Sequence, residues 1–400
     1  MKIGVLLPQA SDLSLLRRAK RLSQRIGEQV DEKGESWSAA IGLPEPRESR
    51  WRNIERELRS DNPHTVIRHL KWEPVPVDNA RRMFAKIPDD LDLDGIEQVM
   101  IPRDWGWNFQ DCDALVVFAD PGLGAILPLR PTIFYCVDLA SRIVPEAFAT
   151  SIEDAYWNRQ TDAFRMWRQA AVATADPAVA DDLVSYAGVR RSHVALVENL
   201  LAPPSSPRAT QKTARDQGML AWPMQPSPLH DLENAVRGLQ IYQAEGGSLR
   251  PTVIRHDGAV GREDEYPYGL PDEQAEFFYA LPSQTAGSER ELLRILARAE
   301  AIWCSRMAGG EGEAAFLAAE TGSIFFGADH ATNRWAAEAA GGSAAFYPLG
   351  EPLAIADALH QLEQGGLTRP RKPRKAKAET VERQDIVSLI ERAVGQRDGV

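Results

Sequence analysis

Short apolar segments rich in β-branched residues alternate with stretches of helical pattern along most of this chain. Apolar runs of this length are typical of strands that are buried on both faces of a parallel sheet. Such strands are expected at residues 113–118, 131–138, 170–174, 194–197, 219–222, 251–254, 301–304 and 323–326. Helical patterns lie between them, one beginning at Pro177 and others over residues 232–245, 288–299, 314–320 and 352–362. The alternation predicts an α/β fold with doubly wound parallel sheets.

A segment rich in proline and serine interrupts the alternation at residues 201–207. Three prolines and two serines among seven residues are typical of a linker. At 400 residues the chain is long enough for two domains that each bury a core. We therefore predict an N-terminal domain over residues 1–203 and a C-terminal domain over residues 208–365.

The last part of the chain, residues 366–400, has a different character. Six cations fall within residues 369–377, where Pro370 and Pro373 interrupt them. This pattern favours a solvated basic linker or a surface contact over a helix. Beyond it, apolar residues at 386, 389, 390, 393 and 394 form one helical stripe, so a final helix that packs against other elements is expected.

The composition excludes several classes of protein. The formal net charge of −11 disfavours nucleic acid as the main partner. Cys112, Cys136 and Cys304 are widely separated, which excludes a disulfide scaffold and a Cys-rich zinc site and fits a reducing cytosol. No apolar run of about 18 residues occurs, and residues 2–7 are typical of a strand rather than a secretory signal. We expect a cytoplasmic protein.

Motifs for metal and serine-hydrolase chemistry are missing from the sequence. The seven histidines show no spacing that would place two of them on one helix face. Neither a Gly-x-Ser-x-Gly elbow nor a Walker motif occurs. No metal is therefore expected.

A glycine-rich stretch follows the strand predicted at residues 301–304. It contains Arg306, Gly309, Gly310 and Gly312, with the next helix opening near Ala314. Glycines at a strand-to-helix turn allow a ligand to approach the backbone, and a helix N-terminus favours a phosphate there. The alternative is a plain tight turn in which two nearby carboxylates, Glu311 and Glu313, serve as helix N-terminal charges.

A matching turn follows the first strand of the C-terminal domain. It contains Ser227, His230 and Asp231. These side chains either face a cleft, with His230 donating to a diphosphate, or form an ordinary loop that Asp231 closes as a helix N-cap.

The N-terminal domain offers one carboxylate and one aromatic stretch. Asp138 ends a predicted strand, where ligands of open α/β sheets bind. The alternative is that Asp138 caps the following turn. Arg103, Trp105 and Trp107 could line an acceptor pocket, because tryptophan faces suit sugar rings. Tryptophans more often belong to a core or an interface.

Three stretches resemble family 4 of the GT-B glycosyltransferases. Residues 131–148 are similar to the strand, His-Asp turn and Pro-Glu-x-Phe segment of that family. Residues 173–199, with Gly188-Val189 and Glu198-Asn199, are similar to its strand and helix and to its "Gly-Val…Val…Pro-Asn-Gly" ending. Residues 222–228, continuing through Gly309 and Gly322 to Pro348, follow its donor-binding half.

The resemblance implies two Rossmann-like domains facing across a cleft, with the C-terminal helix returning to the N-terminal domain. It implies a retaining transfer of sugar from a nucleotide-diphosphate donor to a glycan or lipid-linked acceptor, as in bacterial surface polysaccharide or glycoconjugate synthesis. The reaction would need no metal or other cofactor. Asp138 would position the sugar or acceptor, and Arg103, Trp105 and Trp107 would bind the acceptor. The donor would be bound by Ser227, His230, Arg306, Gly309, Gly310, Glu311, Gly312, Glu313 and Glu320.

The sequence also departs from the family pattern. Val137 replaces the histidine of the His-Asp turn, and His230 stands where the family has a phosphate-binding lysine. The family's paired glutamates fall at Gly309 and Leu317. These departures leave open a catalytically silent GT-B subunit that binds a partner glycosyltransferase or a glycan. In either case the basic segment 369–377 could contact the inner face of an anionic membrane, and in a silent subunit it could also contact a protein partner.

Overall fold

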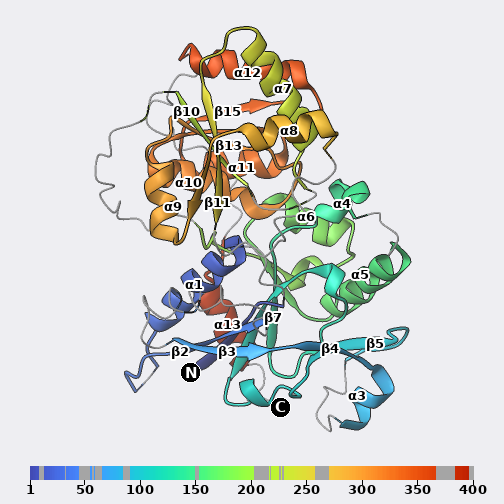
Figure 1. Cartoon of the computed structure of the whole chain (residues 1–400). Coiled ribbons are helices and arrows are strands. Elements are labelled where there is room, and N and C mark those ends of the chain that lie inside the picture. Colours follow the sequence, from blue (N-terminus) through green and yellow to red (C-terminus); the bar gives the residue numbers. More distant parts are fainter. Residues whose placement is uncertain are drawn as a thin grey trace. The chain divides into compact units, whose positions relative to one another are not determined.

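The chain forms two compact units in the computed structural model (Figure 1). Met1–Leu200 and Glu379–Val400 make up unit 1, and Leu201–Ala378 make up unit 2. The described residues are 1–8, 13–31, 33–44, 55, 58, 65–83, 91–148, 153–201, 216, 218–224, 227, 229–256, 270–365 and 383–395. Most of the predicted linker and the whole basic segment 369–377 lie outside these residues.

Unit 1 is built on a parallel sheet of seven strands in the order β3-β2-β1-β6-β7-β8-β9. The strands are β1 (Lys2–Leu6), β2 (Ser38–Pro44), β3 (Thr65–Leu70), β6 (Ala114–Ala119), β7 (Thr132–Cys136), β8 (Ala171–Thr174) and β9 (Val194–Leu196). Every residue of β6 is buried, as expected for a central strand covered on both faces. A separate antiparallel pair joins β4 (Trp72–Pro76) to β5 (Gln98–Pro102).

Helices cover both faces of this sheet. They are α1 (Leu13–Gly27), α3 (Val77–Met83), α4 (Ala140–Ile143), α5 (Glu153–Trp167), α6 (Pro177–Ser185) and α13 (Ile386–Gly395). The expected start of α6 is confirmed, because Pro177 is its first residue and the Asp176 carboxylate accepts from the Ala178 N–H at 2.8 Å. Helices α1 and α13 share one apolar core with β1, whereas α5, α6 and β5 share the core of the other face.

Helix α13 joins the end of the chain to unit 1. Ile386 and Ile390 are fully buried and Leu389 nearly so, in the same core as Val5 of β1. The Gln384 N–H donates to the Leu196 carbonyl at 2.9 Å, which ties the approach to α13 to the end of β9. The apolar stripe of the sequence is therefore the face that α13 buries.

Unit 2 contains a parallel sheet of six strands in the order β12-β11-β10-β13-β14-β15. The strands are β10 (Met219–Pro223), β11 (Arg250–His256), β12 (Ser283–Ala286), β13 (Ala301–Cys304), β14 (Ile324–Ala328) and β15 (Ala344–Tyr347). The helices are α7 (Leu232–Ala244), α8 (Asp272–Ala280), α9 (Glu289–Leu296), α10 (Glu313–Thr321), α11 (Ala331–Ala340) and α12 (Pro352–Glu363). The two parallel sheets confirm the predicted doubly wound α/β class.

Aromatic side chains fill the core of unit 2 along its central strands. The indoles of Trp222 and Trp303 stack with their ring centroids 4.1 Å apart. Trp303 also donates from Nε1 to the Tyr347 hydroxyl at 2.9 Å. Because these rings are fully buried, they hold the carboxyl ends of β10, β13 and β15 in fixed positions.

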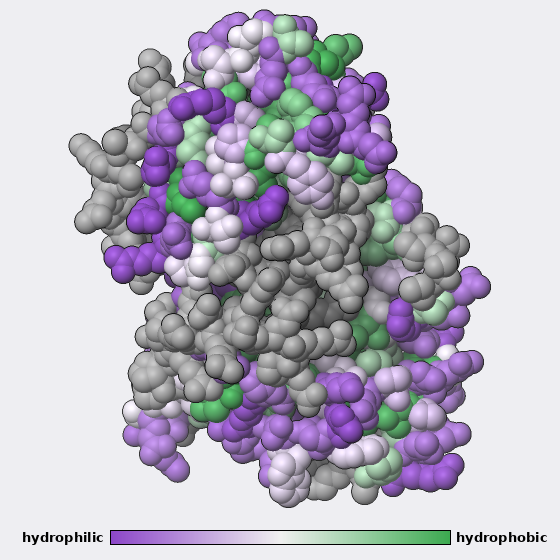
Figure 2. All heavy atoms as spheres, in the orientation of Figure 1, coloured by the Kyte–Doolittle hydropathy of each residue, from purple (hydrophilic) through white to green (hydrophobic). Residues whose placement is uncertain are grey.

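The described surface is mainly hydrophilic on the face that Figure 2 shows, with apolar residues in smaller groups. Within the described ranges, no helix is long and apolar enough to cross a membrane. Cys112, Cys136 and Cys304 are buried, and none of these three forms a disulfide.

Candidate functional site

Two loops of unit 2 meet beyond the carboxyl ends of β10 and β13. The Asp231 N–H donates to the Ser305 carbonyl, and the Met307 N–H donates to the Leu229 carbonyl, both at 2.8 Å. His230 and Arg306 form an antiparallel bridge between the loops. Two residues that the sequence places 76 positions apart are therefore brought side by side.

His230 is held in one orientation by a buried serine. Its Nδ1 lies 3.0 Å from the Ser305 Oγ, which also accepts from Trp222 Nε1 at 3.1 Å. Desolvation, together with the nearby Arg306 charge, lowers the pKa of His230 to about 3. The imidazole is therefore neutral at pH 7. If Ser305 donates its only proton to Nδ1, the remaining His230 proton lies on Nε2, where it is a hydrogen-bond donor for a ligand.

The glycine loop has a backbone that only glycine adopts readily. Gly309, Gly310 and Gly312 have φ values of +76°, +75° and +63°. A Cβ on Gly312 would lie 2.0 Å from the Ala336 Cβ, so no side chain fits there. A Cβ on Gly310 would lie 3.3 Å from the Arg306 Nη1. The loop backbone thus runs directly beside the Arg306 guanidinium and leads into the N-terminus of α10.

Two polar side chains at this loop have unsatisfied buried atoms. The Nε of Arg306 and the Nε2 of His330 are buried without a hydrogen-bond partner. Among the described residues no carboxylate pairs with Arg306. His330 caps α11, where its Nδ1 accepts from the Asn333 N–H at 3.5 Å, and burial lowers its pKa to about 4. An unpaired buried donor costs about 1–3 kcal/mol, so an anion that accepts from Arg306 would stabilise the loop.

The remaining predicted donor residues lie at different distances from this loop. The Ser227 Oγ accepts from the Leu229 N–H at 3.2 Å, so it shapes the loop that carries His230. Glu313 is the first residue of α10. Glu320 lies in the last turn, about 10 Å further along the helix axis, and the structure does not bring it to the loop. The side chain of Glu311 lies outside the described part of the chain.

Two positions next to these residues have structural roles. Leu317, at the position of the family's second glutamate, is only 4% exposed and lies in the apolar face of α10. Asp231 occupies the N-cap position of α7 but makes no capping bond there. Its carboxylate accepts instead from Asn234 Nδ2 at 2.7 Å and from the Gly350 N–H at 3.0 Å. It ties the His230 loop to the end of β15.

Ser305 and His330 were not predicted as site residues from the sequence. Ser305 directly follows the end of β13, and His330 lies two residues after the end of β14. This is the same signal that selected Asp138, so it could have identified them.

In unit 1, two aspartates follow neighbouring strands. Asp138 lies beyond β7, and its Oδ1 accepts from the Ala140 N–H at 3.2 Å, so it does close the turn into α4. Asp120, which sequence analysis missed, follows β6 and accepts from the Gly122 N–H at 2.8 Å. Burial, and then the charge of Asp138, raise the pKa of Asp120. The same carboxyl edge therefore carries two interacting carboxylates.

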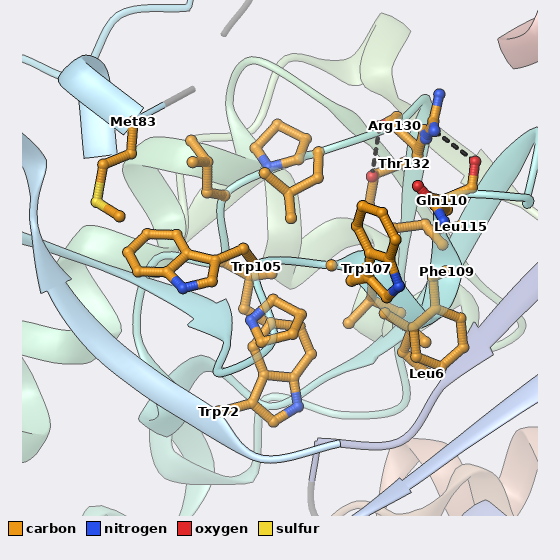
Figure 3. A pocket seen from close by; sticks show the side chains of 17 residues that line it. Leu6, Trp72, Met83, Trp105, Trp107, Phe109, Gln110, Leu115, Arg130 and Thr132 are labelled. Carbon is orange, nitrogen blue, oxygen red and sulfur yellow. Dashed lines mark hydrogen bonds between the residues drawn. The ribbon is translucent and has the colours of Figure 1, made fainter. Parts of the chain in front are cut away.

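The predicted acceptor residues divide between two places. Trp105 and Trp107 line a pocket of about 400 Å³ in unit 1, together with Trp72 (Figure 3). Arg103 is not part of its lining, and its Nε pairs with the Glu73 carboxylate at 3.3 Å. No group of three or more potential metal ligands among His, Cys, Asp and Glu occurs in the described residues.

The comparisons with known proteins rest on structure. No protein-family model matches the chain, and no curated protein matches it by sequence. The Anabaena protein Alr3699/HepE in complex with UDP-glucose is similar with a TM-score of 0.59 and 14% identity, over 100% of both chains. WaaG, a glycosyltransferase involved in lipopolysaccharide biosynthesis, gives a TM-score of 0.51 at 11% identity, over 98% of each chain.

A third similar structure belongs to a different type of enzyme. The putative UDP-N-acetylglucosamine 2-epimerase from Listeria monocytogenes has a TM-score of 0.51 at 9% identity, over 92% of this chain and 88% of that one. At such low identities the similarity concerns the fold. With its two Rossmann-like units and its C-terminal helix on unit 1, the chain has the GT-B fold.

Proposed function

We propose that this chain is a glycosyltransferase that holds a nucleotide-diphosphate sugar at the glycine loop of unit 2. The observation that carries the proposal is the buried Arg306 Nε, which has no partner and lies beside three glycines in the left-handed region. A diphosphate supplies the acceptor atoms that this donor lacks. The complex of the similarly folded HepE protein with UDP-glucose supports this class of donor.

The proposed transfer breaks the bond between the sugar C1 and the diphosphate oxygen and forms a bond from C1 to an acceptor hydroxyl oxygen. Negative charge develops on the leaving diphosphate, where Arg306, the loop N–H groups and the N-terminus of α10 would stabilise it. Neutral His230 would add one hydrogen bond but no charge. The acceptor proton would pass to the leaving phosphate oxygen, in a retaining reaction that uses no metal.

The test is nucleotide binding measured by calorimetry on the full chain with UDP, GDP, dTDP and their glucose derivatives. Arg306→Ala is expected to weaken binding about 10- to 100-fold, since a charge-assisted hydrogen bond contributes about 1.5–3 kcal/mol. Arg294→Ala is the matched control, because Arg294 belongs to the same unit and its side chain is 70% exposed. The absence of binding to every nucleotide would overturn the proposal.

The second candidate is a silent GT-B subunit. It is favoured by the neutral His230 at the position of the family's lysine and by the buried Leu317 at the position of its second glutamate. Nucleotide binding without donor hydrolysis or transfer to any acceptor would favour this candidate over the transferase.

A further inference from the structure

The Trp-lined pocket belongs to unit 1, whereas the glycine loop belongs to unit 2. Trp72 comes from β4, while Trp105 and Trp107 come from the segment between β5 and β6. Trp107 is 70% exposed and Trp105 is 41% exposed. Figure 3 shows these two indoles on opposite sides of the view, with Trp72 below them. The pocket thus exposes aromatic surface to solvent, and a ligand that covers this surface would gain binding free energy.

The backbone of this segment is strained. Trp105 has a φ of +58° and is the only described non-glycine residue with a positive φ. A bulky residue in the left-handed region costs about 1–3 kcal/mol, and such strain concentrates at ligand sites. The Asp104 carboxylate holds the segment by accepting from the Gly106 N–H at 3.1 Å and the Asn108 N–H at 2.9 Å. These hydrogen bonds therefore keep Trp105 in a backbone conformation that is unfavourable for its side chain.

Polar groups gather at one end of the same pocket. Gln110, Arg130 and Thr132 lie together there, and the Thr132 hydroxyl donates to the Arg130 carbonyl at 2.7 Å (Figure 3). The buried Trp72 Nε1 has no hydrogen-bond partner. An acyl chain would offer no acceptor to the Trp72 Nε1, and leaving this buried donor unpaired costs free energy. A pyranose ring offers apolar C–H faces to the indoles and hydroxyls to the polar end.

We propose that this pocket binds one pyranose unit of a glycan. The pocket lies too far from Asp138 to hold the sugar unit of the acceptor that would react there. Thr132 begins β7 and Gln110 precedes β6, whereas Asp138 follows the carboxyl end of β7. Asp138 lies six positions after Thr132 and two beyond the end of β7, a span of at most about 20 Å along an extended chain. The pocket therefore holds a distal part of a longer acceptor. This assignment to the acceptor rests on the proposed function, whereas the inference that the pocket binds a glycan does not depend on it.

The experiment measures binding of the full chain to an array of pyranose oligosaccharides and bacterial surface glycans. Trp107→Ala and Trp105→Gly are the variants, and the second also relieves the backbone strain. Tyr279→Ala, an exposed aromatic residue of unit 2, is the matched control. We expect binding of at least one glycan, a loss of about tenfold or more in both tryptophan variants, and no loss in the control.

Three results would overturn this inference: no glycan bound, glycan binding unchanged in both tryptophan variants, or tryptophan-dependent binding to phosphatidylglycerol vesicles instead of glycans. Binding of UDP, GDP and dTDP is measured in parallel. If none of these nucleotides binds while glycan binding is intact, the proposed function is contradicted and the pocket assignment stands.

Discussion

The carboxyl edges of the two sheets carry opposite chemistry on the same architecture. In unit 2 the central strands lead to Arg306 and a glycine loop, with neutral His230 beside them. In unit 1 the strands β6 and β7 lead to Asp120 and Asp138. A guanidinium beside a glycine-rich backbone can bind a phosphate. Carboxylates repel a phosphate but accept hydrogen bonds from hydroxyl groups. The doubly wound fold supplies the edge, and the residues after each strand decide what it binds.

The largest effect is expected from placing a side chain in the glycine loop of unit 2. Gly312→Val would put its Cβ 2.0 Å from the Ala336 Cβ, whereas Gly341→Val has a similar φ of +67° and nothing within 4 Å. The two variants share the backbone strain and differ in the clash. Gly312→Val should therefore lower the free energy of unfolding by at least about 2 kcal/mol more. Urea denaturation checks this, and equal losses would show that the loop is not tightly packed.

His230 should make the stability of unit 2 depend on pH in a predictable direction. Its pKa is about 3 in the folded state and 6.5 ordinarily, so the unfolded chain binds more protons between these values. The stabilisation is complete above pH 6.5 and is lost as the pH falls toward 3. In His230→Gln this part of the pH dependence should disappear. Thermal denaturation from pH 7 to pH 4 measures it, with His330→Gln as a second variant because His330 shifts in the same direction.

The carboxylate pair of unit 1 should behave in the opposite sense. Burial and Asp138 raise the pKa of Asp120, so the folded state binds its proton more tightly than the unfolded state does. This contribution favours folding below the raised pKa and is lost as the pH rises through it. Asp120→Asn keeps an oxygen for the Gly122 N–H and removes the charge. We expect a higher free energy of unfolding at pH 7 and little change at pH 4.

The control for that experiment is Asp138→Asn. Because this variant lacks the Asp138 charge, the pKa of Asp120 should be lower in it than in the parent chain. NMR titration of the Asp120 carboxyl carbon reads this directly. An unchanged titration midpoint in Asp138→Asn would show that the two carboxylates do not interact, and the comparison between the units would then lose its basis in unit 1.

The smallest effect is expected at Trp107. Because its side chain is 70% exposed, Trp107→Ala should change the free energy of unfolding by no more than about 0.5 kcal/mol. A loss well above that, measured by urea denaturation, would indicate that the indole has a structural role.

Several elements of unit 1 gave only weak signals in the sequence. Strand β2, with the sequence Ser-Ala-Ala-Ile-Gly-Leu-Pro, has small residues and a glycine in place of a β-branched run, although five of its seven residues are buried. Helix α1 contains the fully buried Arg18, which a hydrophobic pattern counts as exposed. In unit 2 the apolar strands β13 and β14 were predicted within one or two residues, because their side chains are buried on both faces.

By itself, the sequence determined the α/β class, the start of α6 at Pro177, the buried stripe of α13 and the glycine loop after β13, because each depends on periodicity or on the backbone freedom of adjacent residues. Only the tertiary structure decided which distant residues meet. The bridge between His230 and Arg306, the approach of Asp120 to Asp138 and the pocket formed by Trp72, Trp105 and Trp107 all depend on strand order. Strand order is set by long-range packing, for which no local sequence pattern exists.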